Sequence, residues 1–199
     1  MLKSTLIHKW NQVPVAVRRF IFRALAILIT WKILYLVFLL PTRVLDKPLS
    51  HAVASSSVWV LNKYTHSADY TTKSETGNIY TDNGLAPAPL ENIYFHQRNV
   101  VSIEDGCNAL ELFVLYTGFI VCMPALVYRK LIFIAGGIIL IYITNIIRCA
   151  GVAYITIYHP KYANFAHHYV LTFMVYGLII ALWLIFSKKL NLVHAETEQ

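Results

Sequence analysis

Residues 131–157 read LIFIAGGIILIYITNIIRCAGVAYITI, an apolar run in which Arg148 is the one charged side chain. A helix of about 20 apolar residues crosses the ~30 Å hydrocarbon core of a bilayer, so this run predicts a transmembrane helix. A guanidinium at membrane depth is costly unless it faces a partner or a wet cavity. Arg148 is therefore a candidate functional residue, and other parts of the chain must supply its surroundings.

The composition of the whole chain is that of an integral membrane protein. Of its 199 residues, 57% are hydrophobic and 14% are charged, which is too apolar for an ordinary soluble domain. The net charge of +7 does not indicate nucleic-acid binding, because the basic residues stand at the ends of apolar runs, as cytoplasmic segments do. The expected partner is a lipid bilayer and no nucleic acid. The basic clusters are Lys3, Lys9, Arg18, Arg19 and Arg23 before the first run, Arg129 and Lys130 between two others, and Lys188 and Lys189 after the last.

Four apolar runs predict an all-α integral membrane protein with four transmembrane helices and both termini in the cytoplasm. The first run is longer than a typical signal-peptide core and no small-residue cleavage site follows it, so we expect a retained anchor. The other spans are expected at 107–128, 131–157 and 169–186, with Arg129 and Lys130 as a tight cytoplasmic turn. The resulting divisions are a basic cytoplasmic N-terminus (1–19), a transmembrane helix (20–40), an extracytoplasmic loop (41–106), a three-helix transmembrane core that carries the candidate site (107–187) and a cytoplasmic tail (188–199).

The loop at 41–106 is polar, with seven acidic residues against five Lys or Arg. Within it, Ala52 to Leu61 is apolar but too short to span a bilayer, which favours a helix lying at the outer interface. Tyrosines and Phe95 in this loop can lie at the level of the lipid headgroups. The alternative is a small, partly β-structured cap in which these aromatic side chains form an ordinary core.

This topology brings four residues to one membrane level. Cys107 begins the second span at its outer end, and His167 and His168 precede the fourth span at the same face. Arg148 follows Leu131 by 17 residues, which places it ~26 Å above the cytoplasmic end of the third span. Helices that pack side by side therefore bring the four residues together near the outer interface.

Each of these residues has a chemical interpretation and a structural one. A cysteine in the first turn of a helix capped by Asp105, and near a cation, can be a nucleophilic thiolate, although a lone cysteine is more often buried packing. Arg148 can stabilise an oxyanion or a thiolate while Asn145 orients it, or it can form a structural ion pair with Glu111. The histidines can act as general acid and base, with His168 preferred because it lies nearer the span, or they can be rim residues.

Other chemistries fit the sequence less well. Adjacent histidines cannot share one helical face, spacings such as Cys-x-x-Cys are absent, and Arg148 would repel a cation, so we expect no metal and no other cofactor. No Gly-x-Ser-x-Gly or phosphate-binding loop occurs. Cys122 and Cys149 lie within apolar runs and are expected to pack as small hydrophobes. Gly136 and Gly137 are expected to allow close helix contact.

Three segments together resemble the exosortase/archaeosortase family. They are EDGCNA at 104–109, NIIR at 145–148, and NFAHH at 164–168 before a final span that contains Tyr176 and Trp183. The similarity covers about residues 100 to 187, and the order and membrane depth of the motifs carry it. Typical members have more spans, so the chain resembles a short, minimal member.

The resemblance implies a membrane-embedded cysteine transpeptidase or protease in the cytoplasmic (inner) membrane of a prokaryote, with its site facing outside. Its substrates would be exported proteins that end in a short motif, a transmembrane helix and a basic tail. The implied catalytic residues are Cys107 as nucleophile, Arg148, and one of His167 and His168, with Asn108, Asn145 and Glu111 as supporting residues.

The expected reaction is acyl transfer. Cys107 attacks the scissile carbonyl, Arg148 stabilises the negative charge, and a histidine protonates the leaving amine; water or a surface amine or hydroxyl then resolves the acyl-enzyme. One alternative is a non-catalytic scaffold of a surface-polysaccharide or secretion assembly. Another is a thiol-redox membrane protein, which is disfavoured because Cys122 lies ~22 Å of helix away from Cys107.

Overall fold

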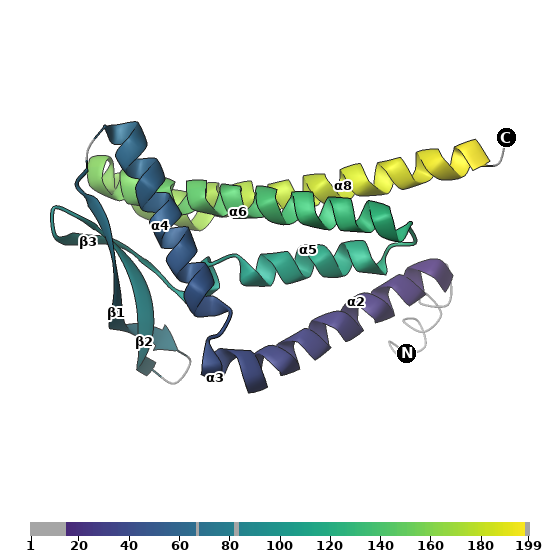
Figure 1. The fold of residues 1–199 in the computed structure, drawn as a ribbon, viewed down its shortest axis with the longest axis horizontal. Coiled ribbons are helices and arrows are strands. Elements are labelled where there is room, and N and C mark those ends of the chain that lie inside the picture. Colours follow the sequence, from purple (N-terminus) through teal and green to yellow (C-terminus); the bar gives the residue numbers. More distant parts are fainter. Residues whose placement is uncertain (1–14, 67, 82–83, 198–199) are drawn as a thin grey trace, which may run out of the picture.

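A computed structural model of the chain describes residues 15–66, 68–81 and 84–197. Within these ranges, three helices are long and apolar enough to cross a membrane: Val17–Thr42, Val127–Tyr158 and Leu171–Lys188. Figure 1 shows them as long rods at one side of a small β-sheet. The prediction of a helical membrane protein is therefore confirmed, whereas four spans are not.

The first span is a continuous helical rod built from three labelled pieces. Helix α2 (Val15–Leu34) leads into a π-helical turn η1 (Tyr35–Leu39) and a last turn α3 (Leu40–Thr42). The rod passes Pro41 by one residue and stops at Arg43, which has a left-handed φ of 50°. The expected span at 20–40 thus lies within the observed helix.

Helix α5 is shorter than the span expected at 107–128, and this is a correction. It runs over Leu110–Cys122, 13 residues, which is ~20 Å of helix and too short to cross a ~30 Å hydrocarbon core. Its start is set by Ala109, which has φ 70° and cannot be helical. Its end is set by extended backbone at Met123 followed by Pro124, because a residue before proline avoids the helical region.

The turn expected at Arg129 and Lys130 also differs from the expectation. Helix α6 (Val127–Tyr158) already contains Arg129 and Lys130, so the turn is made by residues 123–126. Lys130 instead caps the end of α5, because its Nζ donates to the carbonyl of Val121 at 2.8 Å. A cation at a helix C-terminus satisfies exposed carbonyls and complements the helix dipole.

Helices α5 and α6 pack closely at one glycine, as expected from the sequence. A side chain at Gly137 would overlap the ring of Tyr116, whereas nothing lies within 4 Å of the same position at Gly136. Tyr116 is fully buried and its hydroxyl donates to the carbonyl of Phe133 at 2.7 Å. The tyrosine therefore replaces the missing side chain and fixes the distance between the two helices.

The last span follows a bent connection. Helix α6 ends at Tyr158. After His159, a short helix α7 (Pro160–Phe165) and a π-helical turn η3 (Ala166–Val170) lead into α8 (Leu171–Thr197). The apolar part of α8 ends at Lys188. The helix itself continues into the segment expected to be a separate tail at 188–199.

The segment 41–106, expected to be an extracytoplasmic loop, contains a helix and a β-sheet, so the all-α assignment was wrong for this part of the chain. Helix α4 (Asp46–Thr65) is longer than the apolar stretch that suggested it. Strands β1 (Tyr70–Thr81), β2 (Gly84–Phe95) and β3 (Arg98–Ile103) form an antiparallel sheet in the order β1-β2-β3. The alternative of a partly β-structured cap is the one observed.

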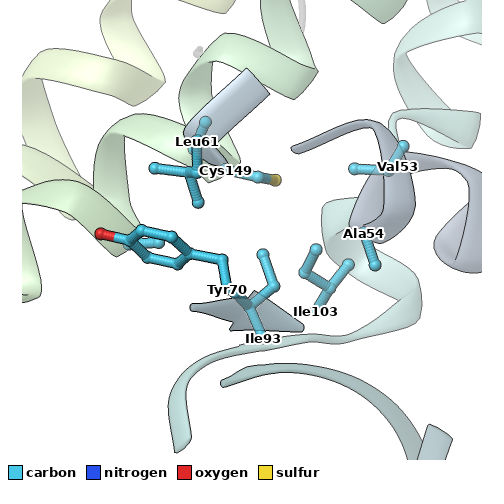
Figure 2. Close-up of a cluster of buried hydrophobic side chains, with 9 residues drawn as sticks. Val53, Ala54, Leu61, Tyr70, Ile93, Ile103 and Cys149 are labelled. Carbon is cyan, nitrogen blue, oxygen red and sulfur yellow. The ribbon is translucent and has the colours of Figure 1, made fainter. Parts of the chain in front are cut away.

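One face of this sheet packs against α4 and α6. Figure 2 shows Tyr70, Ile93 and Ile103 of the sheet pointing toward side chains of both helices, among them Val53 and Cys149. All five are nearly inaccessible to solvent. Helix α4 therefore packs one face against the sheet and α6, while Trp59 and Tyr64 stay exposed, and it does not lie alone at the interface.

Within the described residues, the helix ends that carry basic residues gather at one end of the molecule. In Figure 1, the start of α2, the turn between α5 and α6 and the end of α8 lie on the right, while the sheet lies at the opposite end. This arrangement agrees with the pattern of basic residues from which a cytoplasmic side was predicted.

Candidate active site

Cys107 lies in a tight turn that connects the sheet to α5. The turn is a single 3-10 turn, η2 (Asp105–Cys107), whose first hydrogen bond runs from the Cys107 amide to the Glu104 carbonyl at 2.8 Å. The expectation that Cys107 occupies the first turn of a helix capped by Asp105 was wrong, because Ala109 interrupts the backbone before α5 begins. The side chain of Cys107 is partly exposed.

Asp105 is paired rather than free to repel a thiolate. Arg43 holds it with two nitrogens: Nε donates to Oδ2 at 2.9 Å and Nη2 donates to Oδ1. Both side chains are about four-fifths buried, at 20% and 22% exposure. The hydrogen bond to Asp105 raises the pKa of the Arg43 guanidinium above its usual value. A planar two-nitrogen contact of this kind fixes the geometry of the turn as well as its charge.

Asn108 anchors the other side of the turn to α4. Its amide nitrogen donates to Oδ1 of Asp46 at 2.8 Å and to Oγ of Ser50 at 3.3 Å, and its amide oxygen accepts from the Leu110 backbone at 2.9 Å. Asn108, Asp46 and Ser50 are at most 1% exposed. Buried hydrogen bonds of this kind hold a segment in one conformation, so Asn108 fixes the turn to α4. Its supporting role in catalysis stays a prediction.

Asn145 of α6 contacts the turn from the membrane side. Its side-chain nitrogen donates to the carbonyl oxygen of Cys107 at 2.8 Å, and the residue is fully buried. Arg148 follows one helical turn later, so both residues lie on the side of α6 that faces Cys107. The geometry gives Asn145 a contact with Cys107, where the sequence suggested a contact with Arg148.

A small pocket brings the predicted residues together. Its lining includes Cys107 from the turn, Arg148 from α6 and His167 from η3. The Nε atom of Arg148 is buried and, among the residues that the structure describes, has no hydrogen-bond partner. A buried guanidinium nitrogen without a partner, in a pocket that also contains a thiol, makes this pocket the candidate site for an anionic group. The remaining lining residues are Val101, Ser102, Ile103, Cys149 and Val152.

Of the two histidines, only His167 has a side chain among the described residues. His167 lines the pocket, and its backbone carbonyl accepts from Thr172 at 2.9 Å. The side chain of His168 lies outside the described residues, so the preference for His168 stays a prediction. The π-helical turn that carries both is a feature often found at functional sites.

Glu111 does not pair with Arg148. Its carboxylate lies 2.6 Å from the Nζ of Lys32 on α2, and both side chains are exposed. This contact replaces the structural pair between Glu111 and Arg148 that the sequence suggested, and it explains the lysine within the first span. The two charges satisfy each other at the surface between α2 and α5.

The sequence analysis missed Arg43, Asp46 and Ser50. They lie near the end of the first span, far in sequence from the motifs, and only the fold brings them to the cysteine turn. The sequence offered only a weak indication, because Arg43 and Asp46 are charged residues directly after the first apolar run. Their burial becomes visible only in the structure. Nothing in the local pattern named their partners.

The fold and the pocket define a helical membrane protein with a candidate cysteine-based site. The family model of the transmembrane exosortase (Exosortase_EpsH) matches residues 15–191. The chain therefore belongs to the transmembrane exosortase family, and the resemblance seen in its motifs is confirmed. This is a family of cysteine transpeptidases that act on C-terminal sorting signals in the membrane. Searches of curated proteins and of solved structures found no match.

Proposed function

We propose that the protein is a membrane-embedded cysteine transpeptidase or protease that cleaves C-terminal sorting signals of exported proteins. The observation that carries this proposal is the single pocket lined by Cys107, Arg148 and His167, which come from three separate elements. Packing alone does not require an unpaired guanidinium nitrogen beside a partly exposed thiol. Membership of the exosortase family supplies the class of substrate.

The proposed reaction has two steps. In the first, the Cys107 thiolate attacks the scissile carbonyl carbon, Arg148 donates hydrogen bonds to the oxyanion, and the C–N bond breaks. The leaving nitrogen takes a proton from a histidine, for which His167 is our assignment, and a thioester remains on Cys107. In the second step, water or a surface amine or hydroxyl attacks the thioester. The histidine accepts the nucleophile's proton and Cys107 leaves.

The remaining polar contacts position the nucleophile. Asn145 holds the Cys107 carbonyl, Arg43 holds Asp105, and Asn108 ties the turn to α4. Three attachments on a turn of a few residues limit its motion. A preorganised nucleophile avoids the cost of ordering it during the reaction.

We propose that the site faces outside, in the cytoplasmic (inner) membrane of a prokaryote. The basic ends of the spans support this orientation through the positive-inside rule. A substrate with a C-terminal motif, a transmembrane helix and a basic tail would have the same orientation. Its motif would then reach the pocket from the side of the sheet.

The test is processing in cells that carry the full-length enzyme. A reporter substrate is chosen as a membrane protein of the same cells that has the tripartite C-terminus and accumulates uncleaved when the gene for the whole enzyme is deleted. Cys107→Ala is expected to abolish cleavage of this reporter with unchanged membrane insertion, and Cys122→Ala, a buried cysteine away from the pocket, to cleave normally. Full cleavage by the Cys107→Ala protein would favour a scaffold.

A thiol-redox function is the second candidate, because Cys149 lines the same pocket as Cys107. A redox pair needs both sulfurs, whereas a cysteine peptidase needs one. Cys149→Ala is therefore expected to cleave the reporter normally. Loss of cleavage in this variant, together with a disulfide between the two cysteines in wild-type protein, would favour the redox function instead.

A further inference from the structure

Strand β3 forms one wall of the candidate active-site pocket. Val101, Ser102 and Ile103, three consecutive residues, all line it together with Cys107. Side chains alternate between the two faces of a strand, so three neighbours can line one pocket only where the pocket meets the edge of the strand. The pocket therefore opens onto the backbone of β3.

The edge of β3 that faces away from β2 has no strand beside it. The sheet has the order β1-β2-β3, so within the described residues β3 is an outer strand. At the opposite edge, Tyr70 of β1 bonds through its backbone N–H and C=O to the side chain of Asn62 on α4. Helix α4 thus covers the start of the β1 edge. The edge near the pocket that pairs with no described strand is that of β3, a strand that helix α6 also contacts.

The register identifies the backbone groups that face outward. The backbone N–H and C=O of Tyr70 point away from β2, so its partner Phe95 directs its own N–H and C=O toward β3. Because these groups alternate in direction along a strand, Ile93 and Glu91 also direct theirs toward β3. The β2 residues between these positions, Tyr94 and Asn92, pair with Asn99 and Ser102 of β3. The irregularity of the register lies between these two pairs. Asn99 and Ser102 therefore point their backbone groups at the open edge, and Ser102 also lines the pocket.

We propose that an extended segment of the substrate binds along this edge of β3 as a fourth strand. The proposal rests on the proposed function, and its occupant is the polypeptide that precedes the substrate's membrane helix. An added strand gains main-chain hydrogen bonds without depending on sequence, and its alternate side chains can be read by pockets. Binding next to Ser102 delivers a backbone carbonyl to Cys107.

The direction of the added strand follows from the fold. Strand β3 runs from the hairpin toward the cysteine turn and α5, which in the proposed orientation is toward the membrane. A substrate chain that enters the membrane after its motif runs the same way. The added strand is therefore parallel to β3, with the residues before the cleaved bond beside Asn99.

The first experiment removes one outward-facing amide. Ser102→Pro keeps a strand conformation but deletes the donor, and proline is tolerated where the N–H of an edge strand points outward. We expect the cleavage rate of the reporter defined above to fall about tenfold or more, because the variant loses one hydrogen bond to the substrate and its ring crowds the edge. Thr76→Pro, which removes an outward-facing amide from the other edge strand β1, is the matched control and should cleave normally.

Alkylation of Cys107 by iodoacetamide separates a lost edge from a damaged site. The reagent needs no strand, so Ser102→Pro should be alkylated at the wild-type rate. Wild-type cleavage by Ser102→Pro would overturn the proposal while leaving the function intact. Full cleavage by Cys107→Ala would instead overturn the function.

The second experiment does not depend on the proline variant. Asn99→Cys, an exposed position on β3, is combined with Cys107→Ala, Cys122→Ala and Cys149→Ala and with single cysteines placed along the reporter's motif segment. Successive side chains of a strand point to opposite faces of the sheet, so only every second residue of the bound reporter lies on the same face as residue 99. Disulfides should therefore form at every second reporter position before the cleavage site. The exposed Lys73→Cys on β1 should form none. Disulfides without alternation, or only after the cleavage site, would overturn the proposal.

Discussion

Arg148 illustrates how one residue acquires its role from its surroundings. In the sequence it is an arginine in an apolar run, with Glu111 as a plausible partner. In the structure Glu111 pairs with Lys32, and the Nε of Arg148 is left beside Cys107 without a partner among the described residues. The residue that the bilayer makes costly is thus the one for which we propose a role in binding negative charge.

Substitutions of Arg148 should separate charge from geometry. Lysine keeps the positive charge but loses the planar fork, so Arg148→Lys should cleave the reporter about 10²-fold or more slowly, close to Arg148→Ala. Initial cleavage rates in membranes measure this. Glu111→Ala is the control and should retain cleavage, because the carboxylate lies on Lys32. Near wild-type cleavage by Arg148→Lys would show that charge alone suffices.

The histidines give a second prediction at this scale. Because His167 lines the pocket with Cys107, His167→Ala should lower the cleavage rate by about 10²-fold or more, and His168→Ala should cause a smaller loss. The pH dependence of the cleavage rate is the second readout. If a histidine acts as general acid or base, its removal should abolish the part of the pH dependence that the histidine causes. The reverse order of effects would restore the preference for His168 that its position in the sequence suggested.

The sequence named three residues that line the pocket and also Asn108 and Asn145, which hold the cysteine turn, but it did not name Arg43, Asp46 and Ser50. Cys107, Arg148 and His167 were found because helix lengths convert directly into membrane depth. Arg43 and Asn145 contact the cysteine turn through pairings that cross the fold. Such contacts depend on how helices and sheet pack, which no local periodicity encodes.

At the scale of helices and strands, the apolar runs located three spans well and misjudged a fourth. Helix α5 stops early because Pro124 and the positive φ of Ala109 set its ends, and both act through backbone sterics rather than hydrophobicity. The sheet was harder to predict. Its strands alternate poorly, since β2 contains two prolines and β1 is polar along most of its length, so the period-two pattern that indicates strands is weak.

The contact between α5 and α6 can be tested with two neighbouring glycines. Gly137→Ala should push Tyr116 out of its site and destabilise the protein by about 1–3 kcal/mol, as overpacking does. Gly136→Ala meets no atom within 4 Å and should be neutral or slightly stabilising. Thermal unfolding of the detergent-solubilised proteins compares the two. Equal stability of both variants would contradict the close contact.

At the scale of the whole molecule, the basic ends and the sheet lie at opposite ends of the spans (Figure 1). Composition and charge predicted this division, because lipid solvation and the positive-inside rule act on runs of residues rather than on individual contacts. The internal structure of the loop depended on tertiary packing against α6, and the sequence left two alternatives for it.

The orientation of the molecule should be measurable by cysteine labelling. In a background without the native cysteines, Lys73→Cys on β1 should react with a membrane-impermeant maleimide added to intact cells. Gln199→Cys, at the C-terminus, should react only after the cells are opened. Protection of Lys73→Cys in intact cells would place the sheet inside and contradict an outward-facing site.

The short length of α5 has a consequence for the bilayer itself. A helix of 13 residues leaves a hydrophobic mismatch of ~10 Å against a ~30 Å hydrocarbon core. The lipid beside α5 must thin, or water must descend to the cysteine turn that stands at its end. Either way, the hydrolytic chemistry would take place in a local depression of the membrane. Cleavage should therefore be fastest in proteoliposomes of short-chain lipids and fall as the acyl chains lengthen.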